Sequence, residues 1–435
     1  MAVEVITQTR RLKRHVLPCV LMRAGTSKGM FIHRRDLPAQ QADWAPHLIS
    51  ALGSRCNDPR QIDGVGGGTS TTSKVAVVSV SERPDADVDF TFVQVAIGKE
   101  SVDLTGTCGN MVSGVAPFAV QEGLVKPQPG QIKMDVRVYS TNTDKTVVET
   151  VEIDEATGEY EEDGDYTIPG VSTTGSEVKC AFVNPAGSMT GKLFPSGHRQ
   201  QILRVPPLPL LSRPSDAVYT EPFDVRVSLV DAANPFVLID TTSISTILKT
   251  LPSSDAQDVL VEFVRREGAV AMGLATSVEA AALVRGTPKV ALLYPPFPPL
   301  FTQDGSDKTE TKTSDIRVQS YSMGLPHPSL QLTGAVCLAA ALSCPGTVAA
   351  QLSSTAATDN HGDEIPLTPE RTPSPGETDG AKTGLEAGGE KEVVIAHSKG
   401  TMKVGVVMGR DGEAVSCAVS RTARRLFEGR VRYYV

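Results

Sequence analysis

The sequence predicts an α+β protein made of two similar halves, each of which wraps a sheet around a central helix. Two observations lead to this prediction. Short runs rich in β-branched residues dominate the chain and are separated by glycine, proline and aspartate turns. Two apolar helices each follow a long series of such runs, so the order of elements repeats. With 435 residues, of which 40% are apolar, the chain is long enough for two or three domains with a sizeable core.

The predicted strands share an apolar, β-branched composition and end at turn residues. They comprise residues 16–21, 75–79, 90–97, 133–139, 178–183, 223–229, 236–239, 290–293, 317–320, 393–396 and 402–408. A last strand at residues 429–434 is expected to return to the first half.

Helices are predicted at residues 110–122, 256–267, 278–285 and 333–342. Gly123 is the stop signal of the first helix, and Pro117 is expected to kink or tighten it. The last helix is apolar on all sides and is therefore expected to be buried. If the two halves are similar, the starts of the first and last helices face each other across a cleft.

The boundary between the halves is predicted at the proline-rich residues 204–209, which are typical of a linker. The first domain then covers residues 1–203 and the second 204–416, while residues 417–435 return to the first. Residues 353–391 have almost no large apolar side chains. Such a segment cannot bury enough surface to offset its ordering entropy, so a disordered insertion is predicted there, with a shorter polar loop at 303–314.

Charge and hydropathy exclude several classes of protein. The formal net charge is −8, and the basic residues cluster only at positions 10–14, which argues against nucleic acid as a partner. No apolar run approaches the roughly 18 residues that a membrane span needs, and the N-terminus lacks the apolar core of a secretory signal. We therefore expect a cytoplasmic protein that does not contact a membrane.

The seven cysteines are scattered and include no Cys-x-x-Cys pair, and the seven histidines are also dispersed. This pattern is typical of reduced thiols rather than of a disulfide framework or a zinc site, so no metal is expected. The glycine-rich runs at residues 64–68 and 187–191 match neither a Walker motif nor a Rossmann fingerprint.

Lys74 and Cys108 are the strongest candidates for chemistry. Lys74 closes a glycine-rich and hydroxyl-rich run, and Cys108 begins a helix, where unpaired N–H groups and the macrodipole favour a thiolate and bind carboxylates. A lysine in a partly desolvated cleft loses its proton more easily than one in water. Either residue alone is more often structural, as a solvated strand-end lysine or a small buried cysteine. Together they predict an acid/base pair that moves a proton on carbon.

Several motifs in order along the chain resemble one known family. They are residues 22–29, 61–70 with Ser73-Lys74, Cys108-Gly109-Asn110, 187–197, Asn234-Pro235, Ser322-Met323-Gly324 with His327, and Thr333-Gly334-Ala335. Together these segments resemble the PrpF-like family of aconitate and methylaconitate isomerases. The resemblance covers nearly the whole chain apart from the two polar insertions.

The resemblance implies a diaminopimelate-epimerase-like fold, in which two pseudo-symmetric domains each roll a mainly antiparallel sheet around a central helix and the active site lies between them. It also implies proton transfer on a polycarboxylate without a cofactor, with Lys74 and Cys108 as catalytic residues. The second helix opens with Thr333-Gly334, and Cys337 lies one turn inside it. This departure from the epimerase pattern argues against a symmetric two-cysteine racemase.

A set of substrate-binding residues is expected around this pair. Asn110, Thr333 and Gly334 would offer donors at the two helix starts, and Lys28 and His327 would contact carboxylates. The remaining expected contacts are Ser27, Gly67, Ser73, Gly109 and Met323.

The predicted function is that of an aconitate Δ-isomerase, which converts cis-aconitate to trans-aconitate by a 1,3 allylic proton shift on a small tricarboxylate. The alternatives are a 2-methylaconitate cis-trans isomerase, a 4-oxalomesaconate tautomerase and a non-catalytic polycarboxylate-binding protein. The sequence leaves the oligomeric state open, and a homodimer is one of its alternatives.

Overall fold

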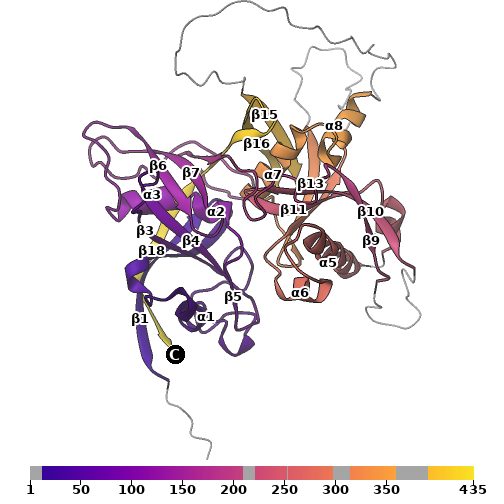
Figure 1. The fold of residues 1–435 in the computed structure, drawn as a ribbon. Coiled ribbons are helices and arrows are strands. Elements are labelled where there is room, and N and C mark those ends of the chain that lie inside the picture. Colours follow the sequence, from indigo (N-terminus) through magenta and orange to yellow (C-terminus); the bar gives the residue numbers. More distant parts are fainter. Residues whose placement is uncertain (1–11, 209–220, 252, 297–313, 359–389) are drawn as a thin grey trace, which may run out of the picture.

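The computed structural model describes residues 12–208, 221–251, 253–296, 314–358 and 390–435. All strands of these residues belong to one continuous, strongly curved sheet, which is rolled up at both ends to give two lobes (Figure 1). The α+β class predicted from the sequence is confirmed.

The first lobe is built from the N-terminal strands and the last strand of the chain. Along the sheet its strands follow the order β18, β1, β2, β3, β4, β6, β7, β8, and β5 adds to the edge of β4. Their bounds are β1 Arg14–Ala24, β2 Ser27–His33, β3 Lys74–Val80, β4 Val88–Val95, β5 Val102–Asp103, β6 Lys133–Ser140, β7 Lys145–Glu152, β8 Val178–Val183 and β18 Ala423–Tyr434.

The second lobe follows the same plan with the order β9, β10, β11, β12, β13, β15, β16, β17, and β14 adds to the edge of β13. Its strands are β9 Gln201–Val205, β10 Phe223–Ala232, β11 Asn234–Asp240, β12 Lys289–Tyr294, β13 Ile316–Ser322, β14 Leu325–Pro326, β15 Lys391–His397, β16 Gly400–Met408 and β17 Ala414–Arg421.

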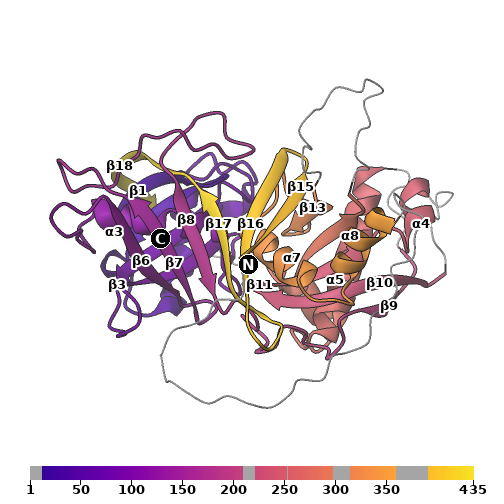
Figure 2. The same cartoon turned by 90° about the horizontal axis from the view of Figure 1, so that it is seen from above.

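The two lobes also agree in strand direction. From β1 to β8 the successive pairs are antiparallel, parallel, antiparallel, parallel, antiparallel and antiparallel, and the pairs from β10 to β17 repeat this series. Strands β8 and β17 then pair with each other and join the lobes, as Figure 2 shows from above. The predicted pair of pseudo-symmetric, mainly antiparallel sheets is therefore confirmed.

Each rolled sheet encloses a central helical segment. The first lobe holds α2 (Gly109–Val112) and α3 (Val115–Gln121), and the second holds α7 (Leu332–Leu342) and α8 (Val348–Thr358). Every residue of α7 is buried, as its all-round apolar sequence predicts. A single apolar cluster of residues from both lobes surrounds these helices, so the lobes share a core.

The first central helix is broken in a different place from the one expected. Its interruption falls at Ser113-Gly114, and Pro117 lies in the first turn of α3. A proline lacks an N–H and would leave a carbonyl unpaired in a continuous helix, whereas the first turn needs no such donor. The buried Glu149 carboxylate accepts the freed Ala116 N–H of that turn at 3.0 Å.

Other helices cover the outer faces of the two sheets. Helix α1 (Trp44–Leu52) packs on the first lobe, and α4 (Ser245–Thr250), α5 (Ser254–Ala271) and α6 (Val278–Leu283) belong to the second. The predicted helices 256–267 and 278–285 correspond to α5 and α6. Helices α1, α4 and α8 were not predicted, and Pro46 within α1 explains why its sequence does not read as helical.

The expected domain limits differ in detail from the observed strands. The boundary at 203/204 falls inside β9, which pairs with β10 of the second lobe over its whole length. Strand β18 pairs with β1 from Ala24 to Arg14, so the C-terminal strand lies among the N-terminal strands (Figure 1).

Part of the predicted insertion 353–391 is ordered. Residues 353–358 belong to α8, and Lys391 begins β15, whereas residues 359–389 lie outside the described residues. The polar loop at 303–314 also lies outside them, except for its last residue.

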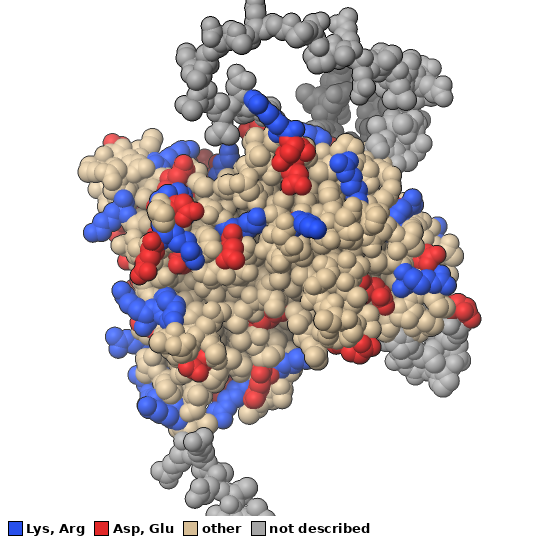
Figure 3. Space-filling model, viewed as in Figure 1, with Lys and Arg blue, Asp and Glu red and all other residues tan. Residues whose placement is uncertain are grey.

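Within the described part of the chain, no helix is both long and apolar enough to cross a membrane. On the face shown in Figure 3, acidic and basic side chains are interspersed over both lobes, and the area between the lobes is largely uncharged.

Candidate active site

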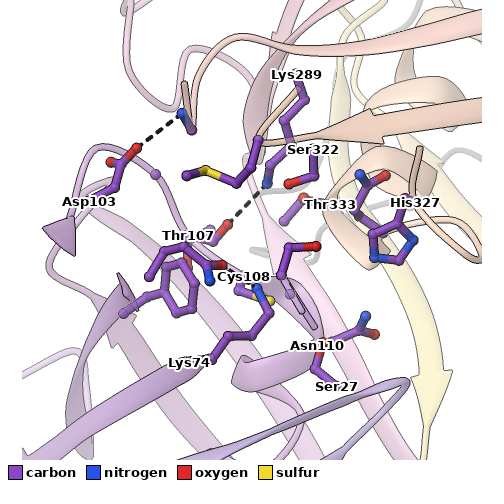
Figure 4. A pocket seen from close by; sticks show the side chains of 18 residues that line it. Ser27, Lys74, Asp103, Thr107, Cys108, Asn110, Lys289, Ser322, His327 and Thr333 are labelled. Carbon is purple, nitrogen blue, oxygen red and sulfur yellow. Dashed lines mark hydrogen bonds between the residues drawn. The ribbon is translucent and has the colours of Figure 1, made fainter. Parts of the chain in front are cut away.

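A pocket lies between the two lobes at the start of helices α2 and α7. Side chains from both lobes line it (Figure 4). The two helix starts abut directly, since a Cβ on Gly109 would lie 2.9 Å from Leu332 Cβ and 3.0 Å from Thr333 N. The predicted meeting of the two helix starts is therefore observed, and a glycine is required at position 109.

Lys74 is the first residue of β3 and is 7% exposed. Its ammonium donates to Gln94 Oε1 at 2.7 Å and lies 4.9 Å from the centre of the Phe92 ring. The Gln94 amide donates in turn to Ser73 O at 2.8 Å, which fixes its oxygen toward Lys74. Burial lowers the pKa of Lys74, while the neighbouring Cys108 thiol acts in the opposite direction. Lys74 therefore loses its proton more readily than a lysine in water.

Cys108 is the N-cap residue of α2, with extended backbone angles (φ −118°, ψ 103°). Its side chain is half-buried and lies beside the Lys74 amine, so the predicted pair is brought together (Figure 4). At this position the first N–H groups of the helix have no carbonyl partner within the helix, and Gly109 and Asn110 line the pocket. The thiol thus lies between an amine and a helix start.

Asn234, the first residue of β11, connects the two helix starts. Its amide donates to Thr107 O at 2.7 Å and to Thr333 Oγ1 at 3.1 Å, and its oxygen accepts the Thr107 N–H at 3.1 Å. These bonds hold the residue before Cys108 against the start of α7. Asn234 does not line the pocket but links the two lobes at the helix starts.

Asn110 is oriented by the turn between β1 and β2 and by the last residue of β17. Its amide nitrogen donates to Thr26 Oγ1 at 3.0 Å, and its oxygen accepts from the buried Arg421 guanidinium at 3.3 Å. Burial lowers the pKa of Arg421 to about 10, so it remains charged at neutral pH. Asn110 is consequently held in one orientation beside the pocket.

His327 closes the pocket on the side of the second lobe. It is 5% exposed, and its Nδ1 lies 2.9 Å from Ser329 O and 3.2 Å from Ser329 N. Burial lowers the pKa of His327 to about 4, with the nearby Lys74 and Lys289 charges acting in the same direction. The imidazole is therefore neutral at pH 7 and offers hydrogen bonding rather than charge.

Most of the residues expected from the sequence line this pocket. From the first lobe these are Ser27, Lys74, Cys108, Gly109 and Asn110, and from the second Met323, His327 and Thr333. Their roles in binding or catalysis stay predictions.

Lys28, Gly67, Ser73 and Gly334 are absent from the lining and have other environments. Lys28 alternates with the pocket-facing Ser27 along β2, so it lies on the opposite face of the strand. The Ser73 hydroxyl is buried and accepts from Gln61 at 2.6 Å. Gly67 packs against Thr72, and Gly334 against Leu330 and Phe236.

The other residues of the lining were not expected from the sequence; they are Ser70, Phe92, Gln94, Asp103, Gly106, Thr107, Gly286, Lys289, Ser322 and Gln331. One of them leaves a clear signal in the sequence. Lys74-Val75-Ala76 and Lys289-Val290-Ala291 are the same tripeptide, and each begins the equivalent strand of its lobe. Aligning the two halves with each other would have identified Lys289.

In the described residues, no group of three or more His, Cys, Asp or Glu side chains is arranged to hold a metal ion. The seven cysteines are all unpaired thiols, of which Cys108 is the one in the pocket.

Comparison with known proteins assigns the chain to a family. The model of the PrpF protein family matches residues 14–362, which is most of the chain. The chain belongs to the PrpF family. Among its relatives, the putative isomerase YraM of Bacillus subtilis is 34% identical, with 94% of this chain and 96% of the relative covered. The 2-methyl-aconitate isomerase of Shewanella oneidensis is 31% identical, with 94% and 95% covered.

A third relative, the 3-methylitaconate isomerase of Eubacterium barkeri, is 32% identical over 95% of this chain and 96% of its own. Among solved structures, that of a methylitaconate-delta-isomerase covers 97% of this chain and 96% of its own, with 29% identity and a TM-score of 0.64. The predicted PrpF membership is thus confirmed, and the chain shares its fold with a solved isomerase structure. The chain is an isomerase of this family.

Proposed function

We propose that this PrpF-family isomerase is an aconitate Δ-isomerase, which interconverts cis-aconitate and trans-aconitate by a 1,3 allylic proton shift. The observation that carries the proposal is the contact of Lys74 with Cys108 in a pocket between two helix starts. An amine and a thiol beside each other provide one group to take a proton and one to give it.

In this mechanism, neutral Lys74 removes a proton from the CH2 arm of the substrate. The electron pair left behind spreads over the allyl system and its carboxylate, and the Cys108 thiol gives a proton to the far carbon. The double bond has then moved by one carbon. Lys74 ends protonated and Cys108 ends as a thiolate, and transfer of the proton between these neighbours restores both groups.

The negative charge that develops on the substrate requires donors that are already in position. The starts of α2 and α7, where the first backbone N–H groups lack helical partners, line the pocket with Gly109, Asn110 and Thr333. Since Asn110 is fixed by Thr26 and Arg421, it needs no rearrangement when the charge forms.

The choice of unsubstituted aconitate rests on the overall resemblance of the motifs. Relatives with similar sequence identity are named for other acids, among them a (4E)-oxalomesaconate Delta-isomerase of Novosphingobium, which is 32% identical. One methyl group changes the binding free energy in an apolar pocket by only about 1–3 kcal/mol, so these substrates need nearly the same binding site. The 2-methylaconitate and oxalomesaconate alternatives therefore remain the competing proposals.

The decisive experiment incubates the purified protein separately with cis-aconitate, 2-methylaconitate and oxalomesaconate in deuterated water and follows each by NMR. The proposal expects trans-aconitate with deuterium at the newly protonated carbon, at a higher kcat/KM than for the other two acids. Faster turnover of a methylated or keto acid would reassign the substrate. Binding of all three acids without any exchange would instead support the polycarboxylate-binding protein.

A further inference from the structure

Lys289 takes the place in the second lobe that Lys74 takes in the first. Each lysine is the first residue of its strand, β12 and β3. Each stands opposite the third residue of the preceding parallel strand, Phe236 for Lys289 and Gly29 for Lys74. The internal symmetry thus brings both side chains into the same pocket from opposite lobes, as Figure 4 shows.

The two amines have different environments. The Lys74 ammonium is bound to the Gln94 oxygen at 2.7 Å, whereas the Lys289 ammonium has a weaker contact, 3.4 Å from Thr107 O. Part of the Lys289 side chain is accessible from the pocket. Its charge is therefore available to a ligand.

No carboxylate of the described residues forms an ion pair with Lys289. Asp103 is the acidic residue of the lining, and its oxygens already accept the Thr105 N–H and hydroxyl at 2.8 and 2.6 Å and the Gly286 N–H at 3.0 Å. Among the described lining residues, Lys74 and Lys289 are the side chains of basic residues other than His327, and Lys74 is neutral when it acts as the base. If Lys74 handles the proton, a carboxylate in the pocket has Lys289 as its cationic partner.

We propose that Lys289 is the carboxylate anchor of this site, and that its ammonium binds one carboxylate of the substrate in the ground state and in the transition state alike. The proposal rests on the proposed function in that the ligand is a polycarboxylate. It gives the role expected of Lys28 to a lysine that lines the pocket. The two equivalent lysines then have different roles: Lys74 transfers the proton, and Lys289 binds a carboxylate of the substrate.

The ionisation of Lys289 agrees with this role. Burial lowers its pKa to about 8, so the side chain is mostly protonated at pH 7, and a bound carboxylate would stabilise the ammonium further. Anchoring should weaken as the pH rises through this value. The titratable groups that face Lys289 are Lys74 on β3, Asp103 on β5, Cys108 before α2, His327 after β14 and Cys337 on α7.

The test measures binding separately from turnover. Propane-1,2,3-tricarboxylate is a saturated tricarboxylate that cannot undergo the allylic shift, and its affinity for the full chain can be measured by calorimetry at pH 7. Lys289→Met should weaken this binding by at least about 10-fold, since it removes a charge-assisted contact. Lys289→Arg, which keeps a charge, should stay within a few-fold of the wild type. Lys133→Met is the matched control because Lys133 is an exposed lysine that also begins a strand, β6.

Three results would overturn the anchor: wild-type protein that does not bind the tricarboxylate, Lys289→Met that binds it like the wild type, or Lys289→Met that loses kcat with an unchanged KM. The last would make Lys289 an acid or base instead.

Should Lys289→Met not fold, the pH dependence of wild-type binding between pH 7 and 9.5 can be compared with that of Lys289→Arg. If Lys289 is the anchor, the affinity of the wild type for the tricarboxylate falls as the pH rises, and that of Lys289→Arg does not. Identical pH profiles for the two proteins would contradict the anchor. Binding that depends on Lys289 without isomerisation of any acid would retain the anchor and reject the proposed reaction.

Discussion

The two lobes have the same strand order, the same strand directions and a lysine at the same position, yet they differ at the helix starts. Cys108 precedes α2, whereas Gln331 precedes α7. In the first lobe the lysine is bound to Gln94 and adjoins a thiol, and in the second it is open to the pocket. A repeated scaffold therefore fixes where side chains meet, while a few differences at equivalent positions give the two lobes different side chains in the shared pocket.

Removing the reactive groups of the first lobe should have the largest effect. Lys74→Ala and Cys108→Ser are each expected to lower kcat for aconitate by about 10²–10⁴-fold, the usual contribution of general acid/base catalysis. Steady-state kinetics with circular dichroism as a folding control would check this. Turnover close to that of the wild type in either variant would exclude that residue from the proton transfer.

Substitution by arginine distinguishes the roles of the two lysines more clearly than substitution by alanine. A guanidinium does not lose its proton in a protein, so Lys74→Arg should remain at least about 10²-fold impaired in kcat. Lys289→Arg should keep most of kcat, because an anchor needs charge and not proton transfer. Equal impairment of both variants, measured side by side on cis-aconitate, would show that the lobes do not divide the roles in this way.

The contact between the helix starts can be broken at a single glycine. In Gly109→Ala the added Cβ would lie 2.9 Å from Leu332 Cβ and 3.0 Å from a backbone nitrogen, so the helix starts must move apart. We expect a loss of about 1–3 kcal/mol in the free energy of unfolding, together with reduced activity. Gly334→Ala is the matched comparison, because its Cβ would meet side-chain atoms at 3.1 Å, which can adjust. Equal denaturation midpoints for the two variants would contradict this difference.

The smallest effect is expected for Lys28, whose side chain lies on the face of β2 opposite Ser27. If Lys28 contacted a carboxylate, as expected from the sequence, Lys28→Met would raise KM, whereas its position outside the pocket predicts a KM within about two-fold of the wild type. Kinetics on aconitate decide between the two readings. A large rise in KM would restore Lys28 as a carboxylate contact.

The parts of the site that follow from local sequence patterns were predictable. Cys108 precedes an apolar helix and Lys74 closes a glycine-rich run, so the residues next to each in the sequence indicate its local structure. The all-apolar sequence of α7 likewise predicts burial.

What depends on contacts between distant segments was not predictable in the same way. Lys289 follows a proline and begins an ordinary strand, and its role becomes visible only when β12 is aligned with β3. The alternation of β2 separates Ser27 from Lys28, but which of them faces the pocket depends on the register with β3. Pro117 predicted an interruption of the first central helix. The position of that interruption involves a contact between distant segments, since the Glu149 carboxylate of β7 accepts an N–H group in the first turn of α3.

The pairing of β18 with β1 has a consequence for the synthesis of the protein on the ribosome. Strand β1 emerges early, but its partner β18 begins roughly 400 residues later in the chain, so those residues must be added first, which takes on the order of 20–80 s at typical elongation rates. During this interval one edge of β1 has no partner and can pair with strands of other nascent chains. The first lobe is completed only once β18 has been synthesised, so a product truncated before this strand would lack the closing strand of the lobe that holds Lys74 and Cys108.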